Sequence, residues 1–309
     1  MQVSKQCVFS VDVEDWFHIL DVPGAPDISA WSTLPSRVEA NFHRLLDLFS
    51  EADRQVTCFF VGWIAERFPH LVREAVARGH EIASHSYAHR LAYSMTRTEF
   101  RADALRSRHL LEDISGTAVI GYRAPGFSST AAIPWFFREL RACGYLYDSS
   151  VFPARHGHGG SPTSVTRPHL VEDGALIEIP ASVAQVGPMR MCFFGGGYLR
   201  LFPYNLIRSM GKRLMADGGS LIFYIHPREL DPAHPRIPMP MHRRFKSYVN
   251  LHTTEAKIRN IVRDFPVTSC RDFLFGSDFE LPYTISEPST FINASIRVPA
   301  ILSSPPRVA

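Results

Sequence analysis

Short apolar runs alternate with segments of helical period along most of this chain, and that alternation limits its fold more than any other feature of the sequence. Apolar side chains recur every three or four residues at Val38, Phe42 and Leu45, as on the buried face of a helix. Gly79 and Gly116 follow such segments, where glycine typically ends a helix. The apolar runs have the length of strands and lie at residues 7–13, 56–61, 80–84, 119–123, 145–148, 176–179, 220–225 and 267–270.

Strands that alternate with helices at this spacing favour a parallel sheet covered by helices. The length of 309 residues suits one α/β barrel as well as two ordinary domains. We therefore expect an α/β protein with one closed or nearly closed (β/α) barrel of seven or eight strand–helix units over residues 1–275. From about residue 276, Ser, Pro and Thr predominate without a period, so residues 276–309 are expected to form a flexible tail. The expected helices lie near residues 38–49, 67–78, 100–116, 133–140, 204–215 and 254–264.

The charge balance and the lengths of the apolar runs bear on which partners this protein binds and where it is located. Lys and Arg total 33 against 30 for Asp and Glu, a formal charge of +3, so no electrostatic argument supports nucleic-acid binding. Every apolar run is shorter than the ~20 residues of a membrane-spanning helix, and the first residues lack the apolar core of a secretory signal. These features predict a cytoplasmic protein without a transmembrane segment. Five widely spaced cysteines, an odd number, predict reduced core thiols.

Acidic and basic side chains stand at the C-terminal ends of four of the expected strands. The C-terminal strand ends of a (β/α) barrel open onto one face, so residues that are distant in the sequence would meet there. We therefore predict an active site from Asp12, Glu14 and Asp15 after the first strand, His85 and His89 after the third, Arg123 at the end of the fourth, and His226 after the strand at 220–225.

Two of these groups have the residue types of a metal site. His85 and His89 are four residues apart, a spacing that can put both imidazoles on one side of a helical turn and within reach of one divalent ion. Carboxylates at the end of an apolar strand are costly to bury unless they bind a metal, an arginine or a proton. The simplest interpretation makes one acidic residue a metal ligand and another a general base.

The remaining candidates suit proton transfer. A guanidinium at Arg123 would hold a neighbouring carboxylate ionised, and an imidazole at His226 titrates close enough to neutral pH to donate a proton. His156 and His158 could form a second metal site in their Gly-rich segment. A flexible loop with two solvated histidines is the favoured interpretation of that segment.

Taken together, these segments resemble the NodB-type polysaccharide deacetylase family, which is carbohydrate esterase family 4-like. Residues 11–15 occupy the place of its acidic first motif, and residues 85–89 match its His-Ser/Thr-x-x-His motif in full. Residues 123–125 match its Arg-x-Pro motif, and residues 225–227 correspond to its late His motif. Order and spacing fit over roughly residues 7–275. Further segments at 226–232 and 245–251 are similar to signatures of the exosortase- and exopolysaccharide-associated branch.

The resemblance implies a single deformed (β/α) barrel, with a family-specific extension from about residue 228. It implies a metal-dependent hydrolase in which Asp12 is the base, Arg123 keeps Asp12 ionised and His226 is the acid. The implied cofactor is Zn²⁺ or a similar divalent ion. Most of the family has two adjacent Asp residues in the first motif, where this chain has a valine after its first Asp.

Because of that departure, the resemblance leaves two candidates for the metal carboxylate beside His85 and His89. Strand alternation favours Glu14, and an early turn of the chain would favour Asp15. The metal-binding set is therefore His85, His89 and one of these two acidic residues.

The implied reaction removes N-acetyl groups from amino sugars of a polysaccharide or its biosynthetic intermediate. The implied partner is an acetylated amino-sugar glycan or a lipid-linked oligosaccharide of exopolysaccharide biosynthesis, with Trp16, Pro125 and Phe127 as candidate substrate contacts. Two alternatives are an allantoinase-like hydrolase of a cyclic amide and a carbohydrate-binding relative without activity. Loss of activity on chelation and release of acetate from a glycan would separate the three.

Overall fold

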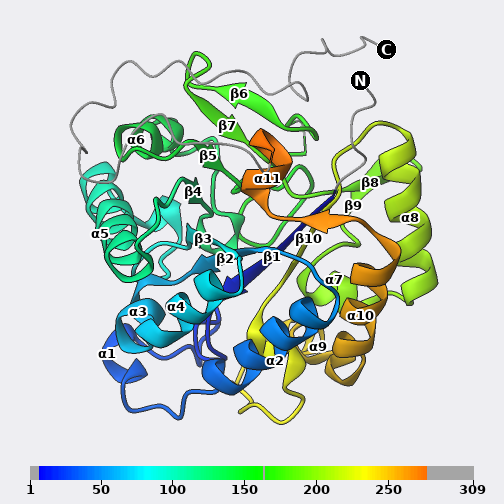
Figure 1. Ribbon diagram of the computed structural model, residues 1–309, viewed down its shortest axis with the longest axis horizontal. Helices are drawn as coiled ribbons and strands as arrows, with labels where there is room; N and C mark the ends of the chain where they lie inside the picture. The colour runs from blue at the N-terminus through cyan, green and yellow to red at the C-terminus, as the bar shows by residue number, and fades with distance from the viewer. Residues whose placement is uncertain (1–6, 163, 277–309) are drawn as a thin grey trace.

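Strand β1 (Cys7–Val13) lies inside the fold, since all seven of its residues are buried. It pairs in parallel with β10 on one side and β2 on the other. The computed structural model describes residues 7–162 and 164–276 (Figure 1). The predicted flexible tail at 276–309 lies outside the described residues from 277 onward.

The main sheet contains nine strands within the described residues, and seven of its neighbouring pairs are parallel. Its order is β10 (Ile222–Ile225), β1, β2 (Thr57–Phe60), β3 (Glu81–Ser84), β4 (Gly121–Tyr122), β5 (Tyr147–Asp148), β7 (Leu176–Glu178) and β6 (His169–Val171), with β11 (Val267–Thr268) beside β1. A separate hairpin pairs β8 (Ala184–Val186) with β9 (Met189–Met191).

Alternation along β1 separates an outer face from an inner face. Phe9 and Val11 point outward into the large apolar core beneath the helices, whereas Val8 points inward into a second apolar cluster. Helix α11 (Cys270–Phe275) closes that inner cluster with Cys270 and Leu274. The same alternation places Ser10 and Asp12 on the inner face, beyond Val8 and toward the C-terminal end of the strand.

The helices surround the curled sheet, as Figure 1 shows. They are α1 (Ile28–Trp31), α2 (Val38–Glu51), α3 (Gly62–Arg67), α4 (Pro69–Ala77), α5 (Arg97–Ser115), α6 (Phe136–Ala142), α7 (Gly196–Leu201), α8 (Tyr204–Ala216), α9 (Met241–Tyr248), α10 (Thr254–Asp264) and α11. The longest, α5, begins with a capping box between Thr96 and Glu99 and ends at Gly116 in the left-handed conformation.

The predicted α/β barrel of strand–helix units is confirmed. Its sheet is curled, and among the described strands β10 and β6 lie at the two ends of the strand order. Two features differ from the sequence-based expectation. Strand β6 runs antiparallel to β7, and Cys270 begins helix α11 although the sequence suggested that the last strand extends to it. All five cysteines are free and buried, as expected for core thiols. Among the described residues, no helix is long and apolar enough to cross a membrane.

Candidate active site

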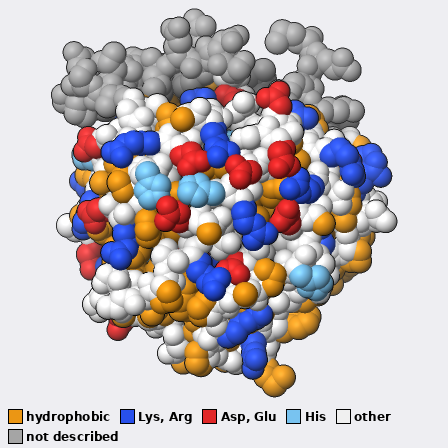
Figure 2. All heavy atoms as spheres, turned by 60° about the horizontal axis from the view of Figure 1, so that its bottom comes forward, with side chains coloured by type: hydrophobic (Ala, Val, Ile, Leu, Met, Phe, Trp, Pro, Cys, Tyr) orange, Lys and Arg blue, Asp and Glu red, His pale blue; other side chains and the backbone are white. Residues whose placement is uncertain are grey.

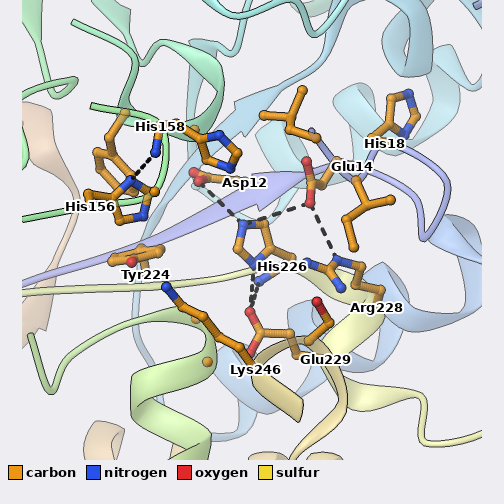
Figure 3. Close-up of a pocket in the computed structure, with 18 of the residues that line it drawn as sticks. Asp12, Glu14, His18, His156, His158, Tyr224, His226, Arg228, Glu229 and Lys246 are labelled. Carbon is orange, nitrogen blue, oxygen red and sulfur yellow. Dashed lines mark hydrogen bonds and ion pairs between the residues drawn. The ribbon is translucent and has the colours of Figure 1, made fainter. Parts of the chain in front are cut away.

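One cavity collects side chains from the C-terminal ends of strands β1, β3 and β10 (Figure 3). Five of the residues predicted to be catalytic or metal-binding line it: Asp12, Glu14, His85, His89 and His226. Arg123 is fully buried and contacts the cavity through Asp12.

Glu14, His85 and His89 form a cluster with the geometry of a metal site. One possible ligand atom from each lies within 4.8 Å of the other two, and all three residues are buried. His85 Nδ1 lies 2.8 Å from the carbonyl oxygen of Arg123. A carbonyl only accepts, so His85 Nδ1 carries the proton and Nε2 has a free lone pair. Burial lowers the pKa of His85 to about 4, which keeps this imidazole neutral.

Glu14 is held in its ionised form by its neighbours. Burial alone would raise its pKa, but His226, His89 and Arg228 outweigh burial and keep the pKa well below its ordinary value. Glu14 Oε2 lies 2.7 Å from Nε2 of His89. An ionised carboxylate beside two imidazoles is a suitable donor set for a divalent cation such as Zn²⁺.

The structure separates the two acidic candidates for the metal carboxylate. Asp15 points away from the histidines and accepts hydrogen bonds from the Ser36 hydroxyl and from the backbone N–H groups of Arg37 and Val38, at 2.5, 3.0 and 3.3 Å. These N–H groups belong to the first turn of α2, which has no side-chain cap of its own. Asp15 therefore caps α2 from outside the helix, and only Glu14 lies beside the histidine pair.

The segment from His85 to His89 is an irregular bend, not the helical turn that the spacing suggested. Ser86 and His89 both have left-handed backbone conformations, with φ of 60° and 49°. Asp103 of α5 stabilises the bend by accepting hydrogen bonds from the N–H groups of Tyr87 and Ala88. This uncommon backbone brings the two imidazole rings to a centroid distance of 5.1 Å.

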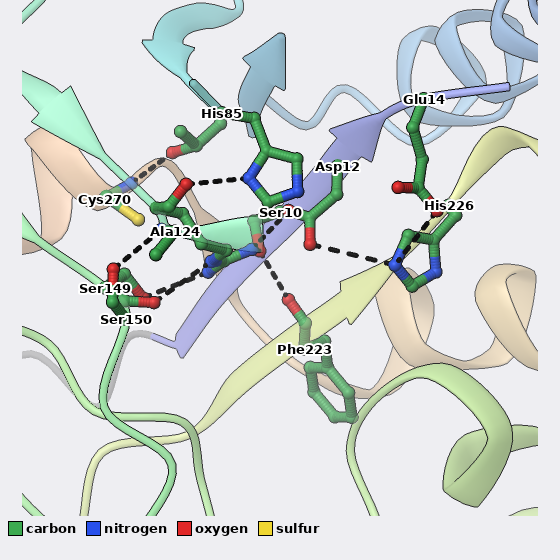
Figure 4. Close-up of polar contacts among 12 residues, drawn as sticks. Ser10, Asp12, Glu14, His85, Ala124, Ser149, Ser150, Phe223, His226 and Cys270 are labelled. Atoms are coloured by element: carbon green, nitrogen blue, oxygen red, sulfur yellow. Dashed lines mark hydrogen bonds and ion pairs between the residues drawn. The ribbon is translucent and has the colours of Figure 1, made fainter. Parts of the chain in front are cut away.

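Asp12 and Arg123 form a buried ion pair on the inner face of the sheet (Figure 4). Arg123 Nη1 donates to Asp12 Oδ1 at 2.6 Å and to Ser10 Oγ at 2.8 Å. Its Nη2 and Nε donate to the side chain and the backbone carbonyl of Ser149. Arg123 is therefore fixed by several partners, and Asp12 Oδ2 is left to face His226 Nε2 at 3.8 Å.

A pair of acidic residues, Asp148 and Glu178, lies behind the network around Arg123. Asp148 accepts a hydrogen bond from the Ser150 hydroxyl, which in turn accepts one from the N–H of Ala124 next to Arg123. Burial raises the pKa of both Asp148 and Glu178, and the neighbouring Asp148 raises the pKa of Glu178 further. Two fully buried carboxyl groups in contact share a proton at neutral pH, because both cannot ionise together.

We expect Glu178→Gln to remove the pH dependence that this pair gives to folding. The folded pair keeps a proton that the unfolded chain releases, so its stabilising effect is complete at low pH and is lost as the pH rises through the folded pKa. Between pH 5 and 7 the wild type should lose about 1.4 kcal/mol of unfolding free energy per pH unit relative to the variant. Urea denaturation at each pH measures this difference. Asp113→Asn, at an exposed position of α5, should parallel the wild type, and parallel curves for Glu178→Gln would contradict the shared proton.

His226 is oriented by a buried ion pair that the sequence analysis did not predict. Its Nδ1 lies 2.6 Å from Glu229 Oε1, and Glu229 is also bound by the buried Arg200. Glu229 therefore keeps the proton of His226 on Nδ1, and Nε2 faces Asp12 and Glu14 at 3.8 and 3.7 Å. Burial lowers the pKa of His226, but the two glutamates outweigh it, so the pKa is raised above its ordinary value.

The three predicted substrate contacts are not all at the cavity. Phe127 lines it, whereas Pro125 is buried and is not among the lining residues. Trp16 lies in a separate apolar cluster with Phe17 and Trp31, and its indole N–H donates to the carbonyl of Pro35. The structure therefore does not bring Trp16 to the cavity, because its large ring packs into the core beside the first motif.

Several cavity residues were missed by the sequence analysis. His18 has its Nδ1 bound by the N–H of Asp15 and its buried Nε2 without a hydrogen-bond partner among the described residues. Arg228, Arg243 and Lys246 also line the cavity. Glu229 had a recognisable signal, since a Glu three residues after His226 has the spacing of a capping box. The other residues lie on loops and on a short helix whose approach to the cavity has no local sequence signal.

Comparisons with known families divide the chain into two parts. Residues 26–147 match the family model described as polysaccharide deacetylase, and residues 149–274 match a domain of unknown function, DUF3473. A peptidoglycan deacetylase of Helicobacter pylori is 34% identical over 87 residues, which are 28% of this chain and 30% of that protein. A peptidoglycan-N-acetylglucosamine deacetylase of Bacillus cereus is 28% identical over 82 residues, 26% of this chain and 30% of that protein. The chain thus matches less than a third of the length of these two curated relatives.

Solved structures support the fold. A polysaccharide deacetylase described as putative, from Mycobacterium smegmatis, aligns with a TM-score of 0.56 at 20% identity over 85% of both chains. Puue allantoinase aligns with a TM-score of 0.57 at 18% identity over 87% of this chain and 90% of that one. At such identities the likeness establishes the curled α/β barrel and does not choose between the two chemistries. The sequence matches support a polysaccharide deacetylase domain at residues 26–147.

Proposed function

We propose that this chain, which carries a polysaccharide deacetylase domain, is a metal-dependent hydrolase that removes N-acetyl groups from amino sugars. The observation that carries the proposal is the buried cluster of Glu14, His85 and His89 beside the Asp12–Arg123 ion pair and His226. An amide hydrolase needs a site for an activated water, a base, and an acid for the leaving amine, and these residues supply one of each.

The donor set fits a divalent metal on the chemistry of its atoms. His85 is neutral with Nε2 free, Glu14 is ionised, and Glu14 and His89 contact each other directly. We assign these three residues as the ligands, with Zn²⁺ as the first metal to test. When bound there, the metal would lower the pKa of a water molecule and polarise the acetyl carbonyl.

Asp12 acts as the general base in this proposal. Arg123 donates a hydrogen bond to Asp12 Oδ1 and fixes that oxygen, so that Oδ2 is available to take a proton from the attacking water. His226 acts as the general acid and protonates the departing amine through Nε2, while Glu229 holds the proton on Nδ1. The proton acceptor and the proton donor are therefore adjacent side chains, 3.8 Å apart.

A backbone N–H of the turn at residues 124–127 is assigned to the oxyanion. Ala124 donates its N–H to Ser150, and Phe127 donates its N–H to Ala124. Gly126 lines the cavity, and we assign its N–H to this role.

We expect Glu229→Gln to lower kcat about 10- to 100-fold with little change in KM, because the imidazole of His226 loses the ionised partner that orients it. Metal content should be unchanged, since Glu229 does not contact the three ligands. Steady-state kinetics together with metal analysis make the test. The melting temperature should also fall, because Arg200 loses its buried counter-charge. A folded variant with wild-type kcat would exclude the positioning role of Glu229.

Acetate release tests the proposal. Purified protein should release acetate from acetylated glucosamine oligosaccharides, lose this activity on chelation and regain it with Zn²⁺. Hydrolysis of allantoin with no acetate from any sugar would favour the cyclic-amide alternative. Binding of a glycan without hydrolysis would favour the inactive alternative.

The cellular setting is a further part of the proposal. A glycan or lipid-linked oligosaccharide of exopolysaccharide assembly, acted on in the cytoplasm, is the setting that the sequence favours. The affiliation of this chain with the exosortase-associated branch stays a prediction from the segments at 226–232 and 245–251.

A further inference from the structure

The second half of the chain lines the active-site cavity with cations. Arg228 follows β10, and Arg243 and Lys246 lie on α9, a helix none of whose residues is fully buried. All three lie within residues 149–274, outside the deacetylase match. The assigned metal ligands and base lie in the first half, so the two halves meet at one cavity.

Arg243 and Lys246 have no acidic counterpart. Among the described residues, no carboxylate oxygen lies within 4.0 Å of a side-chain nitrogen of either residue. Arg243 Nη2 donates to the carbonyl of Leu20 at 2.7 Å, and its Nε is buried without a hydrogen-bond partner. The Lys246 ammonium lies 4.7 Å from the ring centre of Tyr198. A partly buried cation is costly without a counter-charge, so this arrangement is typical of an anion site.

The acidic groups of the cavity do not supply the missing counter-charge. Asp12 is paired with Arg123, and Glu229 is paired with Arg200. Glu14 is assigned to the metal, although Arg228 Nε lies 3.5 Å from its Oε1.

His156 and His158, which also line the cavity, are buried or half-buried, so the expectation of two solvated histidines is wrong. His158 is paired with Asp21 at 2.8 Å, and His156 packs against Phe152 at a ring distance of 4.5 Å. Burial, followed by Lys246, lowers the pKa of His156 to about 3, so its ring is neutral and adds no charge. Arg228 lies beside Glu14, and Arg200 is paired with Glu229, so Arg243 and Lys246 are the lining cations without a carboxylate partner among the described residues.

The outer surface differs from the cavity. On the face shown in Figure 2, basic and acidic side chains are interspersed. Figure 3 shows Lys246 on the side of Tyr224 and His156, with His226 between that side and Glu14 in this view. An anion bound at Arg243 and Lys246 would thus lie in the same cavity as the reacting amide, displaced from the metal ligands.

We propose that Arg243 and Lys246 bind an anionic group, a phosphate or a carboxylate, carried by the acetylated amino-sugar substrate. This inference rests on the proposed deacetylase function and specifies its substrate class. The residues that match a domain of unknown function would then select acidic or phosphorylated glycans. Recognition by two cations of different geometry suits an oxyanion with several acceptor oxygens.

Acetate release from three matched sugars tests the proposal: N-acetylglucosamine, N-acetylglucosamine 1-phosphate and N-acetylmuramic acid. We expect kcat/KM for at least one anionic sugar to exceed that of the neutral sugar by about tenfold or more. Comparing the phosphorylated sugar with N-acetylmuramic acid distinguishes a site for phosphate from a site for carboxylate. Arg243→Gln and Lys246→Met should each lower the anionic-to-neutral ratio about tenfold, mainly through KM.

Arg244→Gln is the matched control, because it removes the same charge from an exposed position on the same helix. It should leave the ratio unchanged. Equal kcat/KM for neutral and anionic sugars, or equal ratios for all three variants, would overturn the anion site while acetate release upheld the deacetylase. Absence of acetate from these sugars and from a neutral acetylated oligosaccharide would remove both proposals.

Discussion

Replacing either His85 or His89 by alanine is expected to remove the bound metal and the acetate-releasing activity together. Both imidazoles belong to the buried three-ligand cluster, and the described residues offer no other group of three ligand atoms within the same reach. Loss of the metal removes several kcal/mol of transition-state stabilisation, so kcat/KM should fall about a thousandfold or more. Metal analysis of the purified variants, paired with the acetate assay, makes the measurement.

Glu14→Gln and Asp15→Asn make the sharpest comparison for the same site. Both changes remove one buried carboxylate from adjacent positions at the end of β1. Glu14→Gln should lose metal like the histidine variants. Asp15→Asn should keep the metal and lose only about 0.3–1 kcal/mol of unfolding free energy, because the amide lacks the negative charge that Asp15 places at the N-terminus of α2. Either histidine variant with full activity, or metal retained by Glu14→Gln and lost by Asp15→Asn, would contradict the assignment.

Asp12→Asn should bind metal normally and turn over poorly. The amide can still accept a hydrogen bond from Arg123, but it cannot take a proton from water, so kcat should fall about 10²- to 10⁴-fold. Substrate binding should change little, since Asp12 acts in the chemical step. Pre-steady-state and steady-state acetate release measure kcat, and metal analysis shows that the site is intact. Wild-type turnover by Asp12→Asn would remove Asp12 from the role of base.

Much of the fold could be predicted because its elements are long or strongly periodic. Helix α10 and strand β1 have the predicted bounds, and β2 and β3 differ from the predicted runs by one residue at either end at most. Strand β6 has half-buried residues and a short antiparallel pairing, so it lacks the apolar run that marked the other strands. Helix α9 is mostly exposed and rich in basic residues, and its sequence alone gives no sign that it lines a cavity.

The sequence predicted the part of the candidate site that is formed by residues at the C-terminal ends of the strands. The structure brings together Asp12, Glu14, His85, His89 and His226, because parallel strands end at the same face. The choice between Glu14 and Asp15 depended on the start of α2, 22 residues later, which takes Asp15 as its cap. The position of Glu229, which orients His226, depends on Arg200. Arg200 lies far away in the sequence and is buried beside Glu229. Such long-range contacts have no local pattern.

The central claim is that Glu14, His85 and His89 hold a divalent metal that is needed to release acetate from an amino sugar. The most direct measurement titrates metal-stripped protein with Zn²⁺ and follows acetate release from an acetylated glucosamine oligosaccharide. Acetate release should rise with added metal and level off at about one metal per chain, the capacity of a single three-ligand site. Full activity in the stripped protein, or no acetate at any metal concentration, would contradict the claim.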